Sequence, residues 1–197
     1  ITGSFGKTST KYILARILQE KYNVLFTPAS FNTPMGVVRT IREGLKSSHQ
    51  IFICEMGAKN IGDIKEICDI VHPTMGIITS VGPQHLETFK TVDNVAKTKF
   101  ELADAVKSAD GSIYVNADSA DALKKASEYD CITYGTEHAE LSVHNVKCDR
   151  FGAKFTVEYN YNSNHIEGNT LTYGQTELLL LFGKVSGEAE MKDFEEM

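Results

Sequence analysis

ITGSFGKTST, residues 1–10, places two glycines, a lysine and several hydroxyl side chains directly before a helical pattern. The usual phosphate-binding pattern is G-x-x-x-x-G-K-[ST], and its first glycine would fall at Ile1, so the spacing here is shorter. A glycine turn between a strand and a helix lets backbone N–H groups face a phosphate. Lys7 would reach the β and γ oxygens, and the Thr8 hydroxyl would hold Mg²⁺. A glycine-rich turn without a ligand is the alternative. We favour phosphate binding because Gly-Lys-Thr opens a helix.

Outward from this loop, helical and strand patterns alternate along the chain up to about residue 136. Apolar residues at helical spacing predict helices, and short apolar runs that end in glycine or an acid predict buried parallel strands. This alternation predicts an α/β domain with a mainly parallel sheet flanked by helices, of the phosphate-loop type. We expect Asp93 or Asn94 to cap the helix that follows them. The expected helices are 7–22, one within 31–46, 61–71, 92–107 and 119–128, and the expected strands are 23–27, 50–57, 75–82, 111–118 and 131–135.

The pattern changes after residue 139. Apolar and polar residues alternate over 140–161 on both sides of the turn 149–152, which predicts a small antiparallel β-hairpin. The stretch 169–182 is expected to add two further strands. We therefore assign 1–182 to one domain, with an antiparallel subregion at about 139–182, and 183–197 to an acidic tail.

Composition excludes several classes of protein. The chain has 197 residues, of which 42% are hydrophobic and 23% charged, as in a soluble globular domain. A net charge of -6 argues against a nucleic-acid partner. No apolar run approaches the ~20 residues that span a membrane. The four cysteines form no C-x-x-C pair, which indicates free thiols in a reducing cytoplasm. No signal peptide is visible, and because the first residue lies inside a motif we expect the chain to be part of a longer protein.

Three further positions could carry chemistry. Glu55 ends an apolar strand, and in open α/β sheets ligands bind outside the carboxyl ends of strands, so it suits a Mg²⁺ ligand or a solvated acid. His85 follows the strand that ends at Gly82, although a lone histidine is more often structural or merely exposed. Lys97 and Lys99 are two residues apart on one helix and point in different directions. We expect one to face the crevice, while a solvated helix face is the simpler reading of both.

Taken in this order, these residues resemble the Mur ligase family, the ATP-dependent amide-bond ligases of bacterial wall precursor synthesis. Residues 2–8, TGSFGKT, match the family loop T-G-[ST]-x-G-K-[ST], so the missing first glycine is a family variant. The stretches 55–64 (EMGAKNIGDI) and 32–37 (NTPMGV) resemble the MurF type within the family. The stretches 85–89 (HLETF) and 94–102 (NVAKTKFEL) are similar to a further family pattern. The resemblance is strong over about 1–136 and looser over the hairpin.

The resemblance implies roles for individual residues. ATP and Mg²⁺ are the implied cofactors, with Thr8, Glu55 and His85 as metal ligands. Lys7, His85 and Lys99 are the implied catalytic residues, and Lys99 matches a lysine that many members carry as a carbamate. Carried over position by position, the nucleotide would contact Gly3, Ser4, Phe5, Gly6, Lys7, Thr8, Ser9 and Asn32.

The implied reaction is phosphoryl transfer from ATP to a UDP-muramoyl-tripeptide carboxylate, followed by attack of the D-alanyl-D-alanine amine. Family members also have an N-terminal UDP-sugar domain and a C-terminal closing domain, which we expect to be missing here, so this chain alone should be inactive. The expected His-Asn pair after 181–184 is replaced by another sequence. Two alternatives stay open: a ligase of the same superfamily, including the folylpolyglutamate type, with a different acid, and a phosphate-loop module that uses nucleotide to control a partner.

Overall fold

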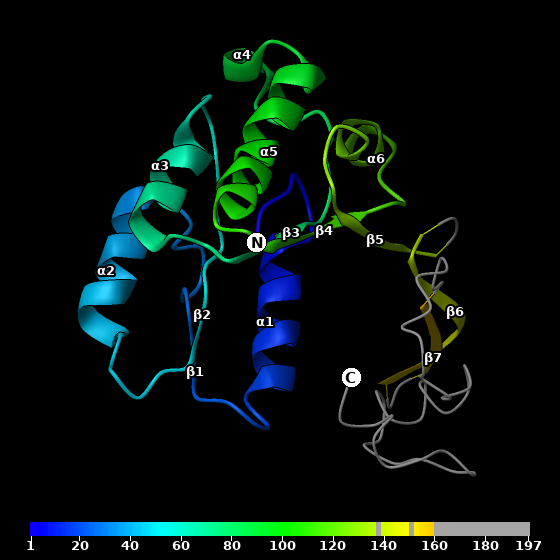
Figure 1. Ribbon diagram of the computed structural model, residues 1–197, viewed down its shortest axis with the longest axis horizontal. Coiled ribbons are helices and arrows are strands. Elements are labelled where there is room, and N and C mark those ends of the chain that lie inside the picture. The colour runs from blue at the N-terminus through cyan, green and yellow to red at the C-terminus, as the bar shows by residue number, and fades with distance from the viewer. Residues whose placement is uncertain (137–138, 150–151, 160–197) are drawn as a thin grey trace. The chain divides into compact units, whose positions relative to one another are not determined.

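The computed structural model describes residues 1–136, 139–149 and 152–159 of the chain (Figure 1). The chain divides into two compact units, residues 1–135 and 136–197. The first unit carries every residue that the sequence singles out as a candidate for chemistry. Each unit is described by itself.

The first unit alternates helices and strands, as predicted. The bounds of several elements are shorter than expected; α1, for example, ends at Leu18, after which the Glu20 and Lys21 N–H groups bond carbonyls three residues back instead of four. The elements are α1 (Lys7–Leu18), β1 (Val24–Phe26), α2 (Pro34–Gly44), β2 (Ile51–Ile53), α3 (Asp63–Val71), β3 (Met75–Ile78), α4 (Leu86–Phe89), α5 (Val92–Ser108), β4 (Ser112–Asn116), α6 (Ala120–Ala126) and β5 (Ile132–Gly135).

The strands of this unit are parallel, and residues 1–2 join them into one surface. β1 pairs with β2, and β3 pairs with β4, which pairs with β5. Thr2 exchanges backbone hydrogen bonds with β3 and its end, through Ile77 and Thr79, while the Ile1 carbonyl accepts from Met56 beyond β2. The order across the sheet is therefore β1, β2, residues 1–2, β3, β4, β5. From residues 1–2 the chain passes through α1 to β1, on one side of the sheet, and it later continues to β3 on the other side of residues 1–2. The glycine loop therefore lies at a topological switch point.

Two apolar clusters lie on opposite faces of these strands, because successive side chains of a strand alternate in direction. Ile53 and Ile77 belong to the cluster under α1, whereas Phe52 and Ile78 belong to the cluster under α2, α3, α5 and α6. Figure 1 shows α5 and α6 on one side of β3–β5 and α1 on the other. Burial on both faces explains why the strands are nearly continuous apolar runs.

The sequence predicted the wrong cap for α5 and did not predict α4. The cap of α5 is Thr91, whose hydroxyl accepts a hydrogen bond from the Asn94 N–H, and Asp93 lies inside the first turn. Threonine satisfies a free N–H at this position as Asp or Asn would, and the pattern did not distinguish the three. The single-turn helix α4 was not predicted, because four residues are too few to show a helical period.

In the second unit, β6 (Leu141–Asp149) and β7 (Gly152–Tyr159) form the predicted antiparallel hairpin. Its register shifts between His144 and Lys147, where Asn145 has a positive φ of 54°. The strands predicted within 169–182 and the acidic tail 183–197 lie outside the described residues. Among the helices of the described ranges, none has the length and apolar character to cross a bilayer.

Gly3 cannot carry a side chain in this fold, which gives a stability test. Its φ is 152°, and an added Cβ would lie 2.1 Å from Thr79 Oγ1 and 2.9 Å from the Ser80 nitrogen. Gly62 has a φ of 93° but open space around it. We expect Gly62→Ala to lose about 1–2 kcal/mol of unfolding free energy, from backbone strain alone. Gly3→Ala should lose about 1–3 kcal/mol more, from overpacking. Chemical denaturation measures the unfolding free energy of both variants. Equal losses would show that the loop shifts to accommodate the added methyl group, which would contradict this prediction.

Candidate functional site

The glycine loop is held by the segment that follows β3. Ser4 and Phe5 donate their N–H groups to the Ser80 carbonyl and the Ser80 hydroxyl, at 2.9 and 2.8 Å. The Thr79 hydroxyl donates to the Phe5 carbonyl at 2.5 Å. Ser4 Oγ, which is buried, accepts from the Gly82 N–H and donates to its carbonyl. The loop is therefore fixed before any ligand binds.

The segment 79–82 is in turn tied to the end of β4. Asn116 Nδ2 donates to the Thr79 carbonyl at 2.9 Å, and Ser119 Oγ accepts from the Val81 N–H at 3.0 Å. These contacts join three neighbouring strand ends into one rigid edge. Neither Asn116 nor Ser119 was singled out from the sequence, because nothing in the pattern shows which strands become neighbours.

The N-terminus of α1 is left open, in contrast to those of α2, α3 and α5. Thr33 caps α2, Thr91 caps α5, and the Glu101 carboxylate accepts the Gly62 and Lys65 N–H groups at the start of α3. No side chain caps α1, and its first turn contains no acidic residue. The N–H groups of residues 6–9 form no hydrogen bond with other described residues. An open helix start with free N–H groups suits an anion.

Lys7 lies on the first turn of α1 and folds back over the loop. Its Nζ donates to the Gly3 carbonyl at 2.7 Å and to the Ser4 carbonyl at 3.4 Å. Partial burial lowers the pKa of Lys7, and the nearby Glu55 carboxylate opposes that shift. The ammonium therefore already stands over the loop, held only by carbonyl oxygens that a phosphate would replace as partners.

Glu55 lies two residues beyond β2, where its side chain is 1% exposed. Oε1 accepts from Thr8 Oγ1 at 3.0 Å and from Asn32 Nδ2 at 3.1 Å, and Oε2 accepts from Lys11 Nζ at 2.8 Å. Burial would raise the pKa of Glu55, but the hydrogen bonds from Lys11, Asn32 and Thr8 outweigh it and hold the pKa below its usual value. The structure thus brings together Thr8, Asn32 and Glu55, all three of which the sequence singled out.

Lys11 is the functional candidate that the sequence analysis missed. It is 0% exposed, and besides Glu55 its Nζ reaches the Ala29 carbonyl at 2.6 Å. One signal was available: Lys11 lies four residues after Lys7, and so on the same side of α1. A lysine on the buried side of an amphipathic helix calls for an acidic partner.

Lys97 and Lys99 point in different directions, as predicted. Lys97 is 57% exposed and pairs with Asp93. Lys99 is 1% exposed and forms no hydrogen bond or ion pair with the described residues. Burial above all, and after it the positive charge of Lys7, lowers the pKa of Lys99 to about 8, against weaker opposing effects of Asp63 and Glu101. Lys99 therefore lies within electrostatic range of the loop lysine and carries a readily deprotonated amine.

The remaining candidates are more dispersed. Phe5 and Ser9 are exposed at the loop and the first turn of α1. His85 is exposed with a φ of 52° at the start of α4, and no hydrogen bond links its ring to Thr8 or Glu55. Across the described ranges, no three His, Cys, Asp or Glu side chains gather as a metal cluster. Thr8 and Glu55 are thus the predicted metal ligands that the structure brings into contact.

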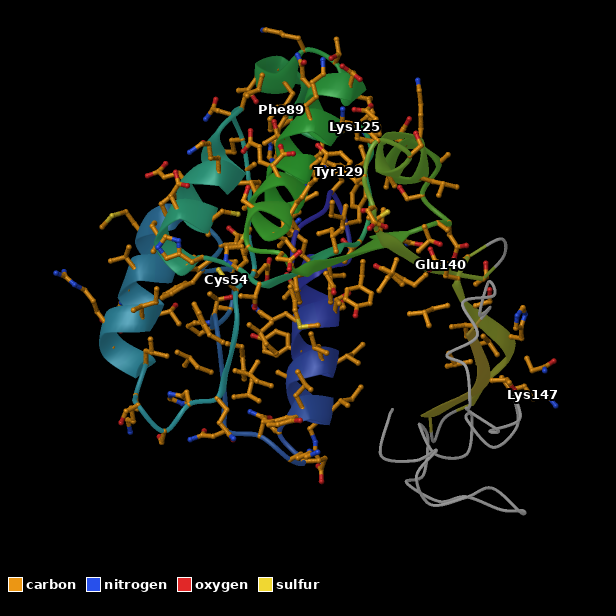
Figure 2. All side chains as sticks on the ribbon, viewed as in Figure 1. Cys54, Phe89, Lys125, Tyr129, Glu140 and Lys147 are labelled. Carbon is orange, nitrogen blue, oxygen red and sulfur yellow. The ribbon has the colours of Figure 1, made fainter. Side chains whose placement is uncertain are left out.

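Two other features lie apart from this chemistry. A cavity of about 440 Å³ between α3 and α5 is lined by Cys68, His72 and Asp104 among others, and by none of the candidate site residues. Among the described residues, Cys54, Cys68 and Cys131 form no disulfide bond. Burial raises the pKa of Cys54 (labelled in Figure 2) to about 12, so this thiol is a poor nucleophile.

Comparison with known proteins finds relatives that are similar in sequence and in fold. The UDP-N-acetylmuramoyl-tripeptide–D-alanyl-D-alanine ligase of Synechocystis is 35% identical over 144 residues, covering 72% of this chain and 31% of that protein. The ligase of the same name from Mycobacterium tuberculosis is 37% identical over 118 residues, covering 60% of this chain and 23% of that protein. The crystal structure of MurF ligase from Thermotoga maritima in complex with ADP matches with a TM-score of 0.73 and 30% identity, covering 81% of this chain and 37% of that one.

The chain thus spans between 23% and 37% of the length of these relatives. The family comparison covers much more of the chain itself, since residues 1–178 match the Mur ligase middle domain. The match includes the glycine loop, Glu55, His85 and Lys99 in one continuous stretch. This chain belongs to the Mur ligase middle-domain family.

Proposed function

We propose that this chain is the ATP-binding part of a ligase that joins D-alanyl-D-alanine to a UDP-N-acetylmuramoyl-tripeptide. The observation that carries the proposal is the contact of Thr8 and Asn32 with the buried Glu55, directly beside the open N-terminus of α1. The names of the relatives, and the ADP in the Thermotoga structure, support the same substrate class.

The loop residues suit the phosphates of ATP. The free N–H groups of residues 6–9 would bind phosphate oxygens, and Lys7 would exchange its carbonyl partners for them. Gly3 and Ser4 hold the backbone in place, while Phe5 and Ser9 border the loop. Asn32 reaches the site through Glu55.

The donor set also fits Mg²⁺, which prefers oxygen ligands and keeps several waters. Thr8 Oγ1 and Glu55 Oε1 already lie 3.0 Å apart and would both hold the metal. When bound, the metal would neutralise charge that develops on the phosphates. His85 is proposed for a second metal position on the family resemblance alone.

The proposed reaction begins with attack of a substrate carboxylate on the γ-phosphorus of ATP, which forms an acyl phosphate and releases ADP. The dipeptide amine then attacks the acyl carbon and displaces phosphate. Lys7 would stabilise the charge on the transferring phosphate. The two peptide substrates would be bound by flanking domains of the same enzyme. Buried free thiols are typical of a reducing compartment, so we propose the cytoplasm as the location.

We further propose that Lys99 carries a carbamate. Its neutral amine would attack carbon dioxide, forming an N–C bond and releasing one proton. The charged Lys99 ammonium would be repelled by Lys7, whereas the carbamate is an anion and would be attracted to it. Burial supports this reaction, since it favours the unprotonated amine.

Removing the Lys7 ammonium tests the nucleotide site. We expect Lys7→Ala to weaken binding of Mg-ATP by about 10- to 150-fold, because a hydrogen bond to a charged group contributes roughly 1.5–3 kcal/mol. Isothermal calorimetry measures the affinity. Lys65→Ala, which removes an exposed lysine paired with Asp69, is the control. Unchanged affinity in Lys7→Ala would contradict the assignment of the loop.

The carbamate is tested by carbon-13 NMR of the chain in labelled bicarbonate. We expect a carbamate signal above pH 8 in the unsubstituted chain and in Lys97→Met, and none in Lys99→Met. Lys97 is the matched control because it lies on the same helix but is exposed. A signal that survives in Lys99→Met would assign the modification to another amine.

The lowered pKa of Lys99 also predicts how stability depends on pH. In carbonate-free buffer the folded chain releases the Lys99 proton near pH 8, whereas the unfolded chain holds it to about 10.5. Between these values the unfolded state binds more protons, so this residue makes unfolding harder as pH rises, by at most about 1.4 kcal/mol per pH unit. Below pH 8 the buried ammonium destabilises the fold. Lys99→Met should therefore be the more stable protein at pH 7, with an advantage that shrinks between pH 8 and 10.5 in denaturation curves. A constant difference would contradict this.

A further inference from the structure

We propose that Lys11 is a positioning residue that orients Glu55 and neutralises it until the metal arrives together with the nucleotide. The inference rests on the proposed function, and it assigns a role to a lysine that touches neither nucleotide nor metal. Four observations support it: the burial of the pair, the division of the carboxylate oxygens, the tie to the loop before α2, and the balance of charge.

The first observation is the burial of both charges. The Lys11 and Glu55 side chains are 0% and 1% exposed, and Nζ lies 2.8 Å from Oε2. Removing either partner leaves an uncompensated buried charge, which is strongly unfavourable. The Lys11 ammonium is therefore committed to Glu55 and is not available to bind a phosphate as Lys7 is.

The second observation is that the two oxygens of Glu55 have separate partners. Lys11 takes Oε2, whereas Thr8 and Asn32 take Oε1. Thr8 Oγ1 and Glu55 Oε1 would hold the metal, and only the hydrogen bond between them would be lost. The Lys11 contact on the other oxygen stays in place, so the carboxylate keeps its orientation with and without metal.

The third observation is the second contact of Lys11. Its Nζ donates at 2.6 Å to the carbonyl of Ala29, a residue with a left-handed φ of 44° in the loop between β1 and α2. The same loop supplies Asn32. Lys11 thus fixes one oxygen of Glu55 directly and helps to fix the other by holding the loop that carries Asn32.

The fourth observation concerns charge. A bare cation approaching Glu55 meets a carboxylate that Lys11 already neutralises, so its attraction to the site is weak. A metal bound to ATP arrives with a net negative charge, which Lys7 and the open helix start attract. The pair therefore favours the metal–nucleotide complex over free metal.

The experiment compares four forms of this chain: unsubstituted, Lys11→Met, Glu55→Gln and the double variant, with Lys65→Met as an exposed-lysine control. Calorimetry gives the affinity for a non-hydrolysable ATP analogue with Mg²⁺ and with chelator. Electron spin resonance gives the affinity for Mn²⁺ alone.

In Lys11→Met we expect the affinity for the analogue in chelator to stay within about twofold of the unsubstituted chain. The gain in that affinity on adding Mg²⁺ should fall at least tenfold, and Mn²⁺ alone should bind at least fivefold tighter. Lys65→Met should match the unsubstituted chain in all three.

Lys11→Met could fail to fold because it leaves Glu55 unpaired, and the double variant covers that case since it has no unpaired charge. There we expect the Mg²⁺ enhancement to equal that of Glu55→Gln alone, because Lys11 acts only through Glu55. A further loss in the double variant, or a Lys11→Met chain that binds Mn²⁺ no more tightly, would overturn the inference. If the unsubstituted chain shows no Mg²⁺-dependent binding at all, the proposed function fails instead, and the inference with it.

Discussion

An ionised carboxylate kept almost free of solvent at the end of a strand is the constraint around which this site is built. Desolvation alone would push the pKa of Glu55 upward, and three donors from α1 and the loop before α2 reverse that shift. Those donors meet only because α1 and the loop before α2 converge beside the end of β2. The parallel order of the strands is thus what makes a buried, ionised carboxylate possible at this edge.

Much of this arrangement was predictable from local patterns. The glycine loop, the alternation of helices with apolar strands, and an acid at a strand end predicted the sheet and the edge where Thr8 and Glu55 meet. Lys11 was not found, because its role depends on Glu55, 44 residues away, and on the Ala29 carbonyl. Helical spacing shows which side of α1 is buried, but it does not show which strand end lies against that side.

The same reasoning separates Lys97 from Lys99. Their spacing predicted that they point apart, yet only the packing of α5 shows that Lys99 is the buried one. Along α5, Phe100 packs against Tyr129, with ring centroids 5.1 Å apart, which helps to fix the rotation of the helix. Figure 2 labels Tyr129. For His85 the sequence offered its place after a strand and the family resemblance, and its exposed position at the start of α4 adds no partner.

The glycine loop, which lacks the first glycine of the usual pattern, is held in place by Ser80 of the neighbouring segment. The Ser4 and Phe5 N–H groups bond to Ser80, so the loop does not turn them toward a ligand. The donors left free belong to residues 6–9, at the open start of α1. Gly3 permits this because only a residue without a side chain fits against Thr79. The Ser4 and Phe5 N–H groups therefore hold the loop rigid, and the proposed phosphate contacts fall to the helix start, next to Lys7 and the Glu55 carboxylate.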